Sequence, residues 1–478
     1  MHERFADRFL HAGQNQLLTK QEGNLSLLNF ACLLKGCSPA YTRRYYGKMD
    51  FGSLAFFSQK KHGISFFSLQ KYQETTRRTF SAYHQRNTKK SPNVQDFQKL
   101  WRVVDGLYSK FNEQRIRQLD EQALQKCISE ILDKIARLLA MTVYTESLDI
   151  PQIQTYFRES GGRASIENSF LQKVVVPTFA SFSQHAHKLL LKKYSNHDAQ
   201  FLFSDYFSSP TEIQAQTRAH SFIRQKGGVQ AMRQTLRQMQ KMTKKSEQVI
   251  RHFWKKLLPQ ERKVFAFVQA SIALRDLRKI PFNKLLVLLN TATREVLQRN
   301  KIPAQLSPYV FYAELEEGVV RQPSYLKVLR SRERRGVNAY FFPNAVHIRS
   351  GAYNQELKQL LRAVGSKARS TQLQGTTAFI GVVEGKVQRI LSEKDFHRFR
   401  KGNILVTSMT RPEFVPLLKK SIAIITDEGG VTCHAAIISR ELQIPCIVGT
   451  QIATRVLKDG MQVRVDAKHG VVQVLKNK

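Results

Sequence analysis

The chain has 478 residues, 76 Lys+Arg against 37 Asp+Glu, and a formal net charge of +39, a length that favours two or three domains. Its five cysteines form no Cys-x-x-Cys pair and have no histidine partners at zinc spacing, so we expect reduced thiols and no metal site. The N-terminus is too polar for a signal peptide, and no apolar run in the sequence reaches the length of about 18 residues that a membrane span needs. We therefore expect a cytoplasmic protein.

The positive charge is concentrated in the N-terminal part of the chain. Residues 371–478 hold 16 Lys+Arg and 9 Asp+Glu, so they account for +7 and the remainder for +32. Such an excess can attract nucleic acid, an acidic partner or phosphorylated ligands. The basic residues are spread along predicted helices with no recognisable nucleic-acid module, so we favour a solvated basic surface over nucleic-acid binding.

The N-terminal region predicts one β-hairpin followed by helices. Apolar runs at 54–57 and 64–67 flank Lys60-Lys61-His62-Gly63, which is typical of a hairpin turn. From about 70 onward, apolar residues recur at three- and four-residue spacings, as in amphipathic helices. Ser160-Gly161-Gly162-Arg163 interrupts this pattern and, without a phosphate-binding fingerprint around it, predicts a loop. We therefore expect a mainly α-helical region over 1–365, divisible into two subdomains near 160.

Residues 260–300 have the most regular helical pattern, which predicts two long helices that meet near Pro281. The apolar positions that define them are Phe265, Val268, Ile272, Leu285, Leu288 and Leu289. Between them lies a basic segment that contains Arg275 and Arg278.

Further on, 366–374 lies in a stretch of small, basic and polar residues and predicts a linker.

Near the C-terminus, a strand, a glycine turn and a helix follow one another. Residues 421–425 predict a buried strand, and His434–Leu442 predicts an amphipathic helix that ends before Pro445, with Thr432 as its N-cap. Backbone N–H groups at a helix N-terminus are unpaired and favour negative charge, so a phosphoryl group on or near His434 would meet an anion site. An idle histidine at a helix end is the alternative.

Residues 429–449 (Gly-Gly-Val-Thr-Cys-His-Ala-Ala-Ile-Ile-Ser-Arg-Glu-Leu-Gln-Ile-Pro-Cys-Ile-Val-Gly) resemble the signature of the phosphohistidine swivelling domain. That domain belongs to the phosphoenolpyruvate-utilising enzymes: phosphoenolpyruvate synthase, pyruvate phosphate dikinase and rifampicin phosphotransferase. Residues 409–414 resemble the family's Met-Thr-x-Pro-acid-aromatic segment, and 458–466 resemble its closing hairpin. Residues 375–387 resemble its opening hairpin, with Phe-Ile where the family has Ser-Pro. The resemblance implies a compact β/α swivelling domain over 375–478.

The resemblance also assigns roles to individual residues. His434 is implied as the phosphocarrier nucleophile. Support for the phosphate is implied for Gly429, Gly430, Thr432, Cys433 and Arg440, and docking for Thr410, Arg411 and Glu413. Arg275 and Arg278 lie in a segment similar to one in the helical linker of synthase-like relatives. An anion site is one role for this pair, and helix–helix ion pairs are the role we favour.

The resemblance implies a phosphotransferase component, in which a phosphohistidine carries a phosphoryl group from phosphoenolpyruvate, or from ATP with magnesium, to an acceptor. Neither an ATP-grasp domain nor a phosphoenolpyruvate-binding barrel is recognisable in the chain, so we expect a separate nucleotide- or phosphoenolpyruvate-binding enzyme as partner. A catalytically silent binding or regulatory protein that retains the fold is one alternative. A basic nucleic-acid-associated protein is another.

Overall fold

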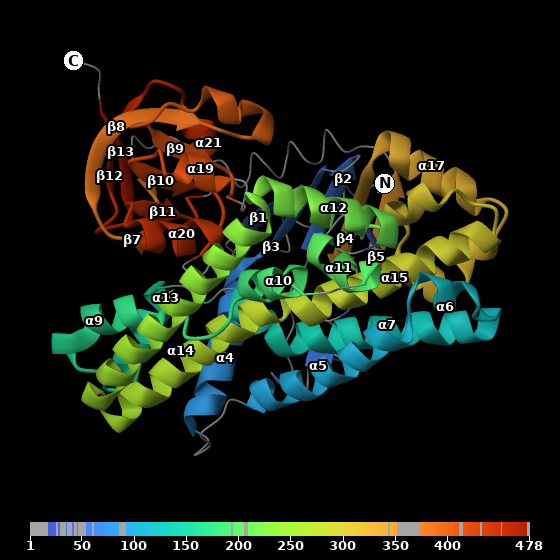
Figure 1. Ribbon diagram of the computed structural model, residues 1–478, viewed down its shortest axis with the longest axis horizontal. Coiled ribbons are helices and arrows are strands. Elements are labelled where there is room, and N and C mark those ends of the chain that lie inside the picture. The colour runs from blue at the N-terminus through green and yellow to red at the C-terminus, as the bar shows by residue number, and fades with distance from the viewer. Residues whose placement is uncertain are drawn as a thin grey trace, which may run out of the picture. The chain divides into compact units, whose positions relative to one another are not determined.

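The computed structural model describes residues 18–24, 27–28, 35, 41–42, 45, 54–59, 62–85, 92–146, 148, 150–192, 195–204, 209–342, 345–350, 372–410, 414–430, 433–450 and 452–475. The chain forms two compact units. One comprises Met1–Glu146 with Val176–Lys358, and the other Ser147–Val175 with Gln359–Lys478. The mainly helical N-terminal part and the C-terminal β-sheet domain confirm the predicted fold class (Figure 1).

The first unit is built mainly of helices that pack through apolar stripes. Several of them begin at side chains that accept a backbone N–H, among them Asp120 before α7 and Thr211 before α12. The helices are α4 (Leu69–Gln85), α5 (Pro92–Lys110), α6 (Glu113–Arg117), α7 (Glu121–Thr142), α10 (Phe182–Leu190), α11 (Asn196–Gln200), α12 (Glu212–Gln225), α13 (Gly228–Lys256), α14 (Pro259–Leu277), α15 (Lys279–Arg299), α16 (Tyr312–Glu316) and α17 (Tyr325–Arg335). Short 3-10 turns connect them: η1 (Val143–Glu146), η2 (Phe201–Phe203), η3 (Ala304–Tyr309) and η4 (Val319–Arg321).

The two long helices predicted over 260–300 are α14 and α15. Pro281 lies in the first turn of α15, where a missing N–H costs no intrahelical hydrogen bond. All six apolar positions that predicted the helices are buried. α15 packs against α5 and α7, so it forms the centre of this unit.

A five-stranded sheet completes the first unit, with strand order β1-β3-β2-β4-β5. The predicted hairpin is present as β2 (Leu54–Gln59) and β3 (His62–Ser68), which pair antiparallel. The other strands are β1 (Leu18–Asn24), β4 (Val337–Phe342) and β5 (Ala345–Ser350). β4 pairs with β2, so Phe56 lies opposite Ala339. The sequence analysis missed this pairing because no local pattern identifies a strand's partner far along the chain.

A buried ion pair fixes the end of the helical region. Arg332 on α17 donates both terminal nitrogens to the Glu314 carboxylate, at 2.6 and 2.8 Å. The same carboxylate accepts the Tyr325 hydroxyl at 2.6 Å and the Phe311 N–H at 2.9 Å. Arg332 also donates to the Tyr309 carbonyl. This network ties η3, α16 and α17 together.

The second unit contains α8 (Ile150–Glu159), α9 (Ala164–Val174) and the C-terminal domain. The break between the two helices falls at 160–163, as the sequence predicted. The C-terminal strands are β6 (Gln372–Gln374), β7 (Thr376–Phe379), β8 (Val382–Arg389), β9 (Ile404–Thr407), β10 (Ala423–Thr426), β11 (Cys446–Val448), β12 (Gln462–Asp466) and β13 (Val471–Val474). The connections include η5 (Glu393–Arg398), α19 (Val415–Leu418), α20 (His434–Leu442) and α21 (Ala453–Val456).

These eight strands form one sheet in the order β6-β13-β12-β8-β9-β10-β11-β7. β8 joins the antiparallel half of the sheet to the parallel half, since it pairs antiparallel with β12 and parallel with β9. β9, β10 and β11 are parallel neighbours, so their carboxyl ends lie at the same edge. Because β6 begins at Gln372, the sheet already includes part of the stretch 366–374 that was predicted as a linker. Residues 366–371 lie outside the described part.

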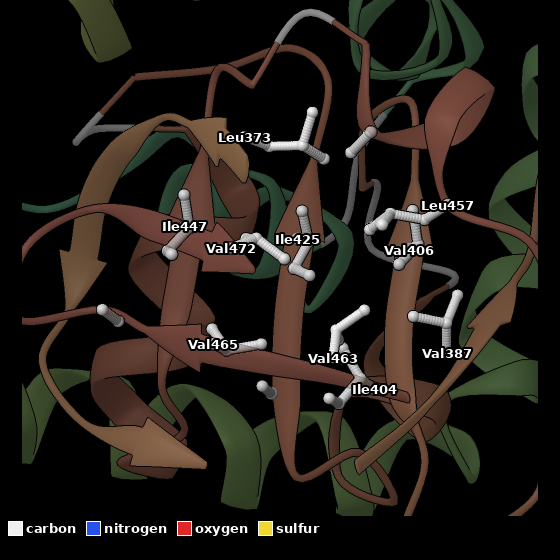
Figure 2. Close-up of a cluster of buried hydrophobic side chains, with 13 residues drawn as sticks. Leu373, Val387, Ile404, Val406, Ile425, Ile447, Leu457, Val463, Val465 and Val472 are labelled. Atoms are coloured by element: carbon white, nitrogen blue, oxygen red, sulfur yellow. The ribbon is translucent and has the colours of Figure 1, made fainter. Parts of the chain in front are cut away.

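Both faces of the parallel strands are buried, which places two hydrophobic cores in the domain. One core lies between the two halves of the sheet and includes Ile425, Val463 and Val472 (Figure 2). The other lies between the parallel strands and the helices, and includes Ile424, Leu418 and Ala435. Successive side chains of a strand point to opposite faces of the sheet, so neighbouring residues of one strand enter different cores.

The predicted opening hairpin over 375–387 is wrong in one respect. Both strands exist, as β7 and β8, but they are not paired with each other. β7 pairs with β11 at an edge, whereas β8 lies inside the sheet between β12 and β9. Two strands with a short connection predicted a local hairpin, but pairing with later segments of the chain takes precedence here. The turn between them is connected to the end of β12, because the Gly381 carbonyl accepts the Ala467 N–H.

None of the helices in the described residues combines the length and the apolar character needed to cross a membrane.

Candidate functional site

His434 is the first residue of α20 and lies at the carboxyl edge of the parallel strands. The helix has the predicted bounds, and the strand before it, β10, ends at Thr426. Loops that follow β9, β10 and β11 leave the sheet at this edge, which is where open α/β sheets usually bind ligands. The His434 side chain is neither fully buried nor fully exposed. The histidine is therefore accessible, and the helix and the sheet edge hold it in place.

Thr410, in the segment after β9, holds the His434 ring. Its hydroxyl oxygen lies 2.9 Å from His434 Nδ1, and the threonine itself is buried. The sequence analysis placed Thr410 at a docking surface; the structure places it on the histidine. A hydrogen bond at one ring nitrogen fixes the ring orientation.

The loop between β10 and α20 is pinned to the segment after β9. Asp427 N–H donates to the Thr407 carbonyl, and Glu428 N–H donates to the Ser408 carbonyl. Gly429 has φ +113°, and a Cβ built there would lie 2.7 Å from Cys433 Sγ. Only glycine meets both the left-handed backbone and the close approach, so Gly429 is required for the turn into α20. The Gly430 carbonyl accepts the Cys433 N–H at 2.9 Å.

Asp427 is a buried support residue that sequence reasoning missed. Its carboxylate accepts the Thr454 N–H at 2.9 Å and also the Thr454 hydroxyl. Thr454 lies on α21, so the carboxylate connects the end of β10 to a helix that follows β11. The available signal was weak: an acidic residue directly after a buried strand often caps a neighbouring segment.

Cys433 is the N-cap of α20, one position after the predicted Thr432. Its side chain makes no capping hydrogen bond. Thr432 itself lies outside the described residues, as do Arg411 and Glu413. Burial raises the pKa of the Cys446 thiol, which lies close enough to Cys433 for the two thiols to interact electrostatically. A thiol with a raised pKa stays protonated, so Cys446 is a core residue here.

Arg440 is not brought to the His434 ring. Six residues along an α-helix correspond to about 9 Å of rise and about two-thirds of a turn beyond a full one, so the two side chains leave different faces. Burial lowers the pKa of Arg440, and the thiols of Cys433 and Cys446 act in the opposite direction. The guanidinium thus belongs to the last turn of α20 and interacts electrostatically with the thiols of Cys433 and Cys446.

Arg275 and Arg278 belong to the first unit. Arg278 follows α14 and donates to the Thr142 hydroxyl at the end of α7, at 3.3 Å. Their neighbour Asp276 accepts the Phe182 N–H at 2.7 Å and pairs with Lys279 at 2.8 Å. This segment therefore joins helices by polar contacts. Among the residues that the structure describes, no group of three or more His, Cys, Asp or Glu side chains is placed to hold a metal.

Comparison with known proteins confirms the predicted resemblance of the C-terminal domain. Residues 399–470 match the family model "PEP-utilising enzyme, mobile domain". A probable phosphoenolpyruvate synthase of Archaeoglobus fulgidus is 56% identical over 100 residues, 21% of this chain and 13% of that protein. Its counterpart in Methanothermobacter thermautotrophicus is 49% identical over 106 residues, 22% and 16% of the two chains. Phosphoenolpyruvate synthase of Pyrococcus furiosus is 51% identical over 100 residues, 21% and 12%.

The similarity is confined to this domain, and the chain spans less than a fifth of the length of these curated relatives. Among solved structures, Thermococcus kodakaraensis aconitase X in its holo-form matches 22% of this chain and 98% of its own, at 25% identity. Its TM-score of 0.19 is too low to bear on the fold. The chain thus combines a mobile domain of the phosphoenolpyruvate-utilising type with a long N-terminal part that these relatives do not match.

Proposed function

We propose that the protein is a phosphotransferase component in which His434 carries a phosphoryl group from a donor to an acceptor. The observation that carries this proposal is the hydrogen bond between Thr410 and His434 Nδ1 at the N-terminus of α20. This hydrogen bond orients the His434 ring at a helix N-terminus, a position that stabilises an anion. The match of 399–470 to the mobile domain of phosphoenolpyruvate-utilising enzymes supports the same chemistry.

The reaction follows from the state of the imidazole ring. When Nδ1–H donates to Thr410, the lone pair of the neutral ring is on Nε2, and we assign the nucleophile to that atom. Nε2 attacks the phosphorus in line, an N–P bond forms, and the P–O bond to the donor breaks. The enolate of pyruvate leaves from phosphoenolpyruvate, or a nucleotide leaves from ATP. An acceptor oxygen then attacks the phosphorus, and the N–P bond breaks to restore the ring.

The helix end assists both halves of the cycle. N–H groups in the first turn of α20 have no partner within the helix, and the positive end of its dipole lies beside His434. This disfavours the imidazolium, which has no lone pair, and stabilises the dianionic phosphoryl group after transfer. Arg440, in the last turn of the helix, contributes a positive charge that interacts electrostatically with the thiol of Cys433, the residue before His434.

The extent of the similarity supports a proposal for the donor and the partner. The curated relatives are several times longer than the matched domain, and their names identify them as phosphoenolpyruvate synthases. We therefore propose phosphoenolpyruvate, or ATP with magnesium, as donor, bound by a separate enzyme that docks on the mobile domain. The first unit would bind the acceptor or this partner.

The test is phosphorylation of the purified chain with labelled phosphoenolpyruvate and, separately, with ATP labelled at the β or γ position. We expect an acid-labile, alkali-stable label that is absent in His434→Ala. His469→Ala is the matched control, because His469 is an exposed histidine of the same domain that pairs with Asp466.

The source of the label separates the outcomes. Label from a pure donor means that the chain holds a complete site, which contradicts the separate donor enzyme but not the phosphocarrier. Label only after addition of a cell extract supports a phosphocarrier with a partner. If neither condition labels the wild type, or if His434→Ala is labelled equally, the phosphocarrier proposal is wrong and a non-catalytic binding protein is left.

A further inference from the structure

α13 presents a continuous row of positive side chains that the phosphocarrier does not explain. It is one uninterrupted helix of 29 residues in the first unit (Figure 1). Six exposed basic residues recur along it at spacings of three, four or seven: Arg233, Arg237, Lys241, Lys244, Arg251 and Lys255. Such spacings keep all six within about a quarter of the helix circumference. The row is about 33 Å long, at 1.5 Å per residue.

These charges are not used inside the protein. Glu247, the acidic residue of α13, lies 4.0 Å from Arg251, whose side chain is largely exposed, so this pair is weak. Within the part of the chain that the structure describes, the side chains of the other five basic residues form no ion pair or hydrogen bond; Lys255 is bonded only through its backbone, where its carbonyl accepts from Arg262. Six cations with so little compensation repel one another unless an anion binds along the row.

The opposite face of α13 is already occupied. Met232 and Phe253 are buried, and Met232 packs in a cluster with Leu190 of α10 and Ala219 of α12. Gln184 of α10 donates to the Thr243 hydroxyl at 2.8 Å. A helix that binds a membrane surface needs a continuous apolar face for the lipid. On α13 the buried apolar residues pack against α10 and α12, and the exposed ones, Val229, Met242 and Val249, are too few to form such a face.

We infer that this row, the α13 basic row, binds nucleic acid through the phosphate backbone without reading the base sequence. Successive cations along the row are about one helical turn apart, near 5.4 Å, except that Lys244 and Arg251 are about two turns apart. The full length of about 33 Å exceeds the span of any small phosphorylated ligand. The row carries no aromatic or aliphatic side chain, whereas protein interfaces centre on such residues and stacking on single-stranded bases needs aromatics. A duplex, with its regular high charge density, is the complementary partner. The overall charge of +39 favours its approach.

The test measures binding of the full chain to a fluorescein-labelled mixed-sequence DNA duplex of about 30 base pairs, by anisotropy from about 50 to 200 mM salt. Arg233→Gln/Arg237→Gln/Lys241→Gln/Lys244→Gln should weaken binding about 100-fold or more and reduce the slope of log K against log salt by about 3 to 4. Glutamine has a helix propensity close to that of lysine and arginine, so the helix should persist, which circular dichroism checks.

Two control variants distinguish an effect of the α13 basic row from an effect of the net charge of the protein. Lys401→Gln/Lys419→Gln/Lys420→Gln/Lys468→Gln removes the same charge from exposed positions of the C-terminal domain and should change the affinity by less than about threefold. Arg233→Lys/Arg237→Lys/Arg251→Lys keeps the charge and should keep the affinity. The inference fails if the wild type does not bind the duplex, or if both glutamine variants weaken binding equally. It also fails if the α13 variant loses binding to phosphatidylserine vesicles while duplex binding is unchanged.

Discussion

At the scale of single residues, Thr410 decides how the His434 ring is presented. Thr410→Val keeps the shape of a buried side chain and removes the hydrogen bond at Nδ1. Loss of the hydrogen-bond partner that orients a metal-binding histidine costs about 10- to 100-fold, and we expect a fall of similar size in the rate of His434 phosphorylation. Single-turnover labelling measures the rate, and Thr410→Ser should retain most of it. Equal rates in Thr410→Val and wild type would contradict a positioning role.

The pair of Glu314 and Arg332 is the residue-scale determinant of stability in the first unit. The carboxylate and the guanidinium are both largely buried, so removing one charge leaves the other uncompensated. Glu314→Gln should therefore lower the free energy of unfolding by roughly 3 to 5 kcal/mol. Urea denaturation at neutral pH measures the loss. Glu121→Gln is the control: Glu121 pairs with Arg321 at 2.9 Å on the surface, where a pair contributes at most about 1 kcal/mol.

The same carboxylate predicts a pH dependence. Burial alone would raise the pKa of Glu314, but the hydrogen bonds and charge of Arg332, with the Tyr325 hydroxyl, lower it below its ordinary value of 4.5. The folded protein therefore holds this proton less tightly than the unfolded chain. The stabilisation is complete above pH 4.5 and is lost as the pH falls toward the lowered pKa. Urea denaturation between neutral pH and acid should show a steeper loss for wild type than for Glu314→Gln.

At the scale of elements, the turn from β10 into α20 depends on Gly429. Gly429→Ala introduces a Cβ in a left-handed backbone and 2.7 Å from Cys433 Sγ. We expect a loss of about 1 to 3 kcal/mol and a displaced helix start that slows phosphorylation of His434. Gly460→Ala is the matched control, because Gly460 has φ +85° but open space around it, so only the backbone strain is added. Similar effects of the two substitutions on phosphorylation would show that the close approach to Cys433 is unimportant.

The C-terminal elements were predictable because their signals are local. The spacing of apolar residues placed α20, and the buried β-branched run at 421–425 placed β10, within a residue or two of the structure. The glycine turn placed His434 at the start of the helix. The contact between Thr410 and His434 was not predictable from periodicity, because it depends on the parallel pairing of β9 with β10, which brings two loops together.

The pairings between distant segments explain what the sequence analysis missed. β4 and β5 join the N-terminal hairpin across most of the chain, and β7 and β8 separate although one short turn joins them. The alternation of apolar and polar residues along a strand shows which of its faces is buried, but it does not show which strand pairs with it. Ile424 and Ile425 illustrate this limit: both are fully buried, and only the fold shows that they enter different cores.

At the scale of the whole molecule, a mobile domain requires that the two compact units unfold separately. A phosphocarrier that visits two sites cannot depend on one permanent interface for its stability. We therefore expect two transitions in calorimetry, one for each unit.

The two destabilising variants assign these transitions. Glu314→Gln should lower the melting temperature of one transition only, because Glu314 belongs to the unit of 176–358. Gly429→Ala should lower only the other, which belongs to the unit of 359–478. If both variants lower a single shared transition by similar amounts, the units unfold as one cooperative body, and the mobility that phosphoryl transport between separate sites requires is absent. Two independent shifts would instead show that the unit carrying His434 folds without the other unit, as the proposed phosphoryl transport requires.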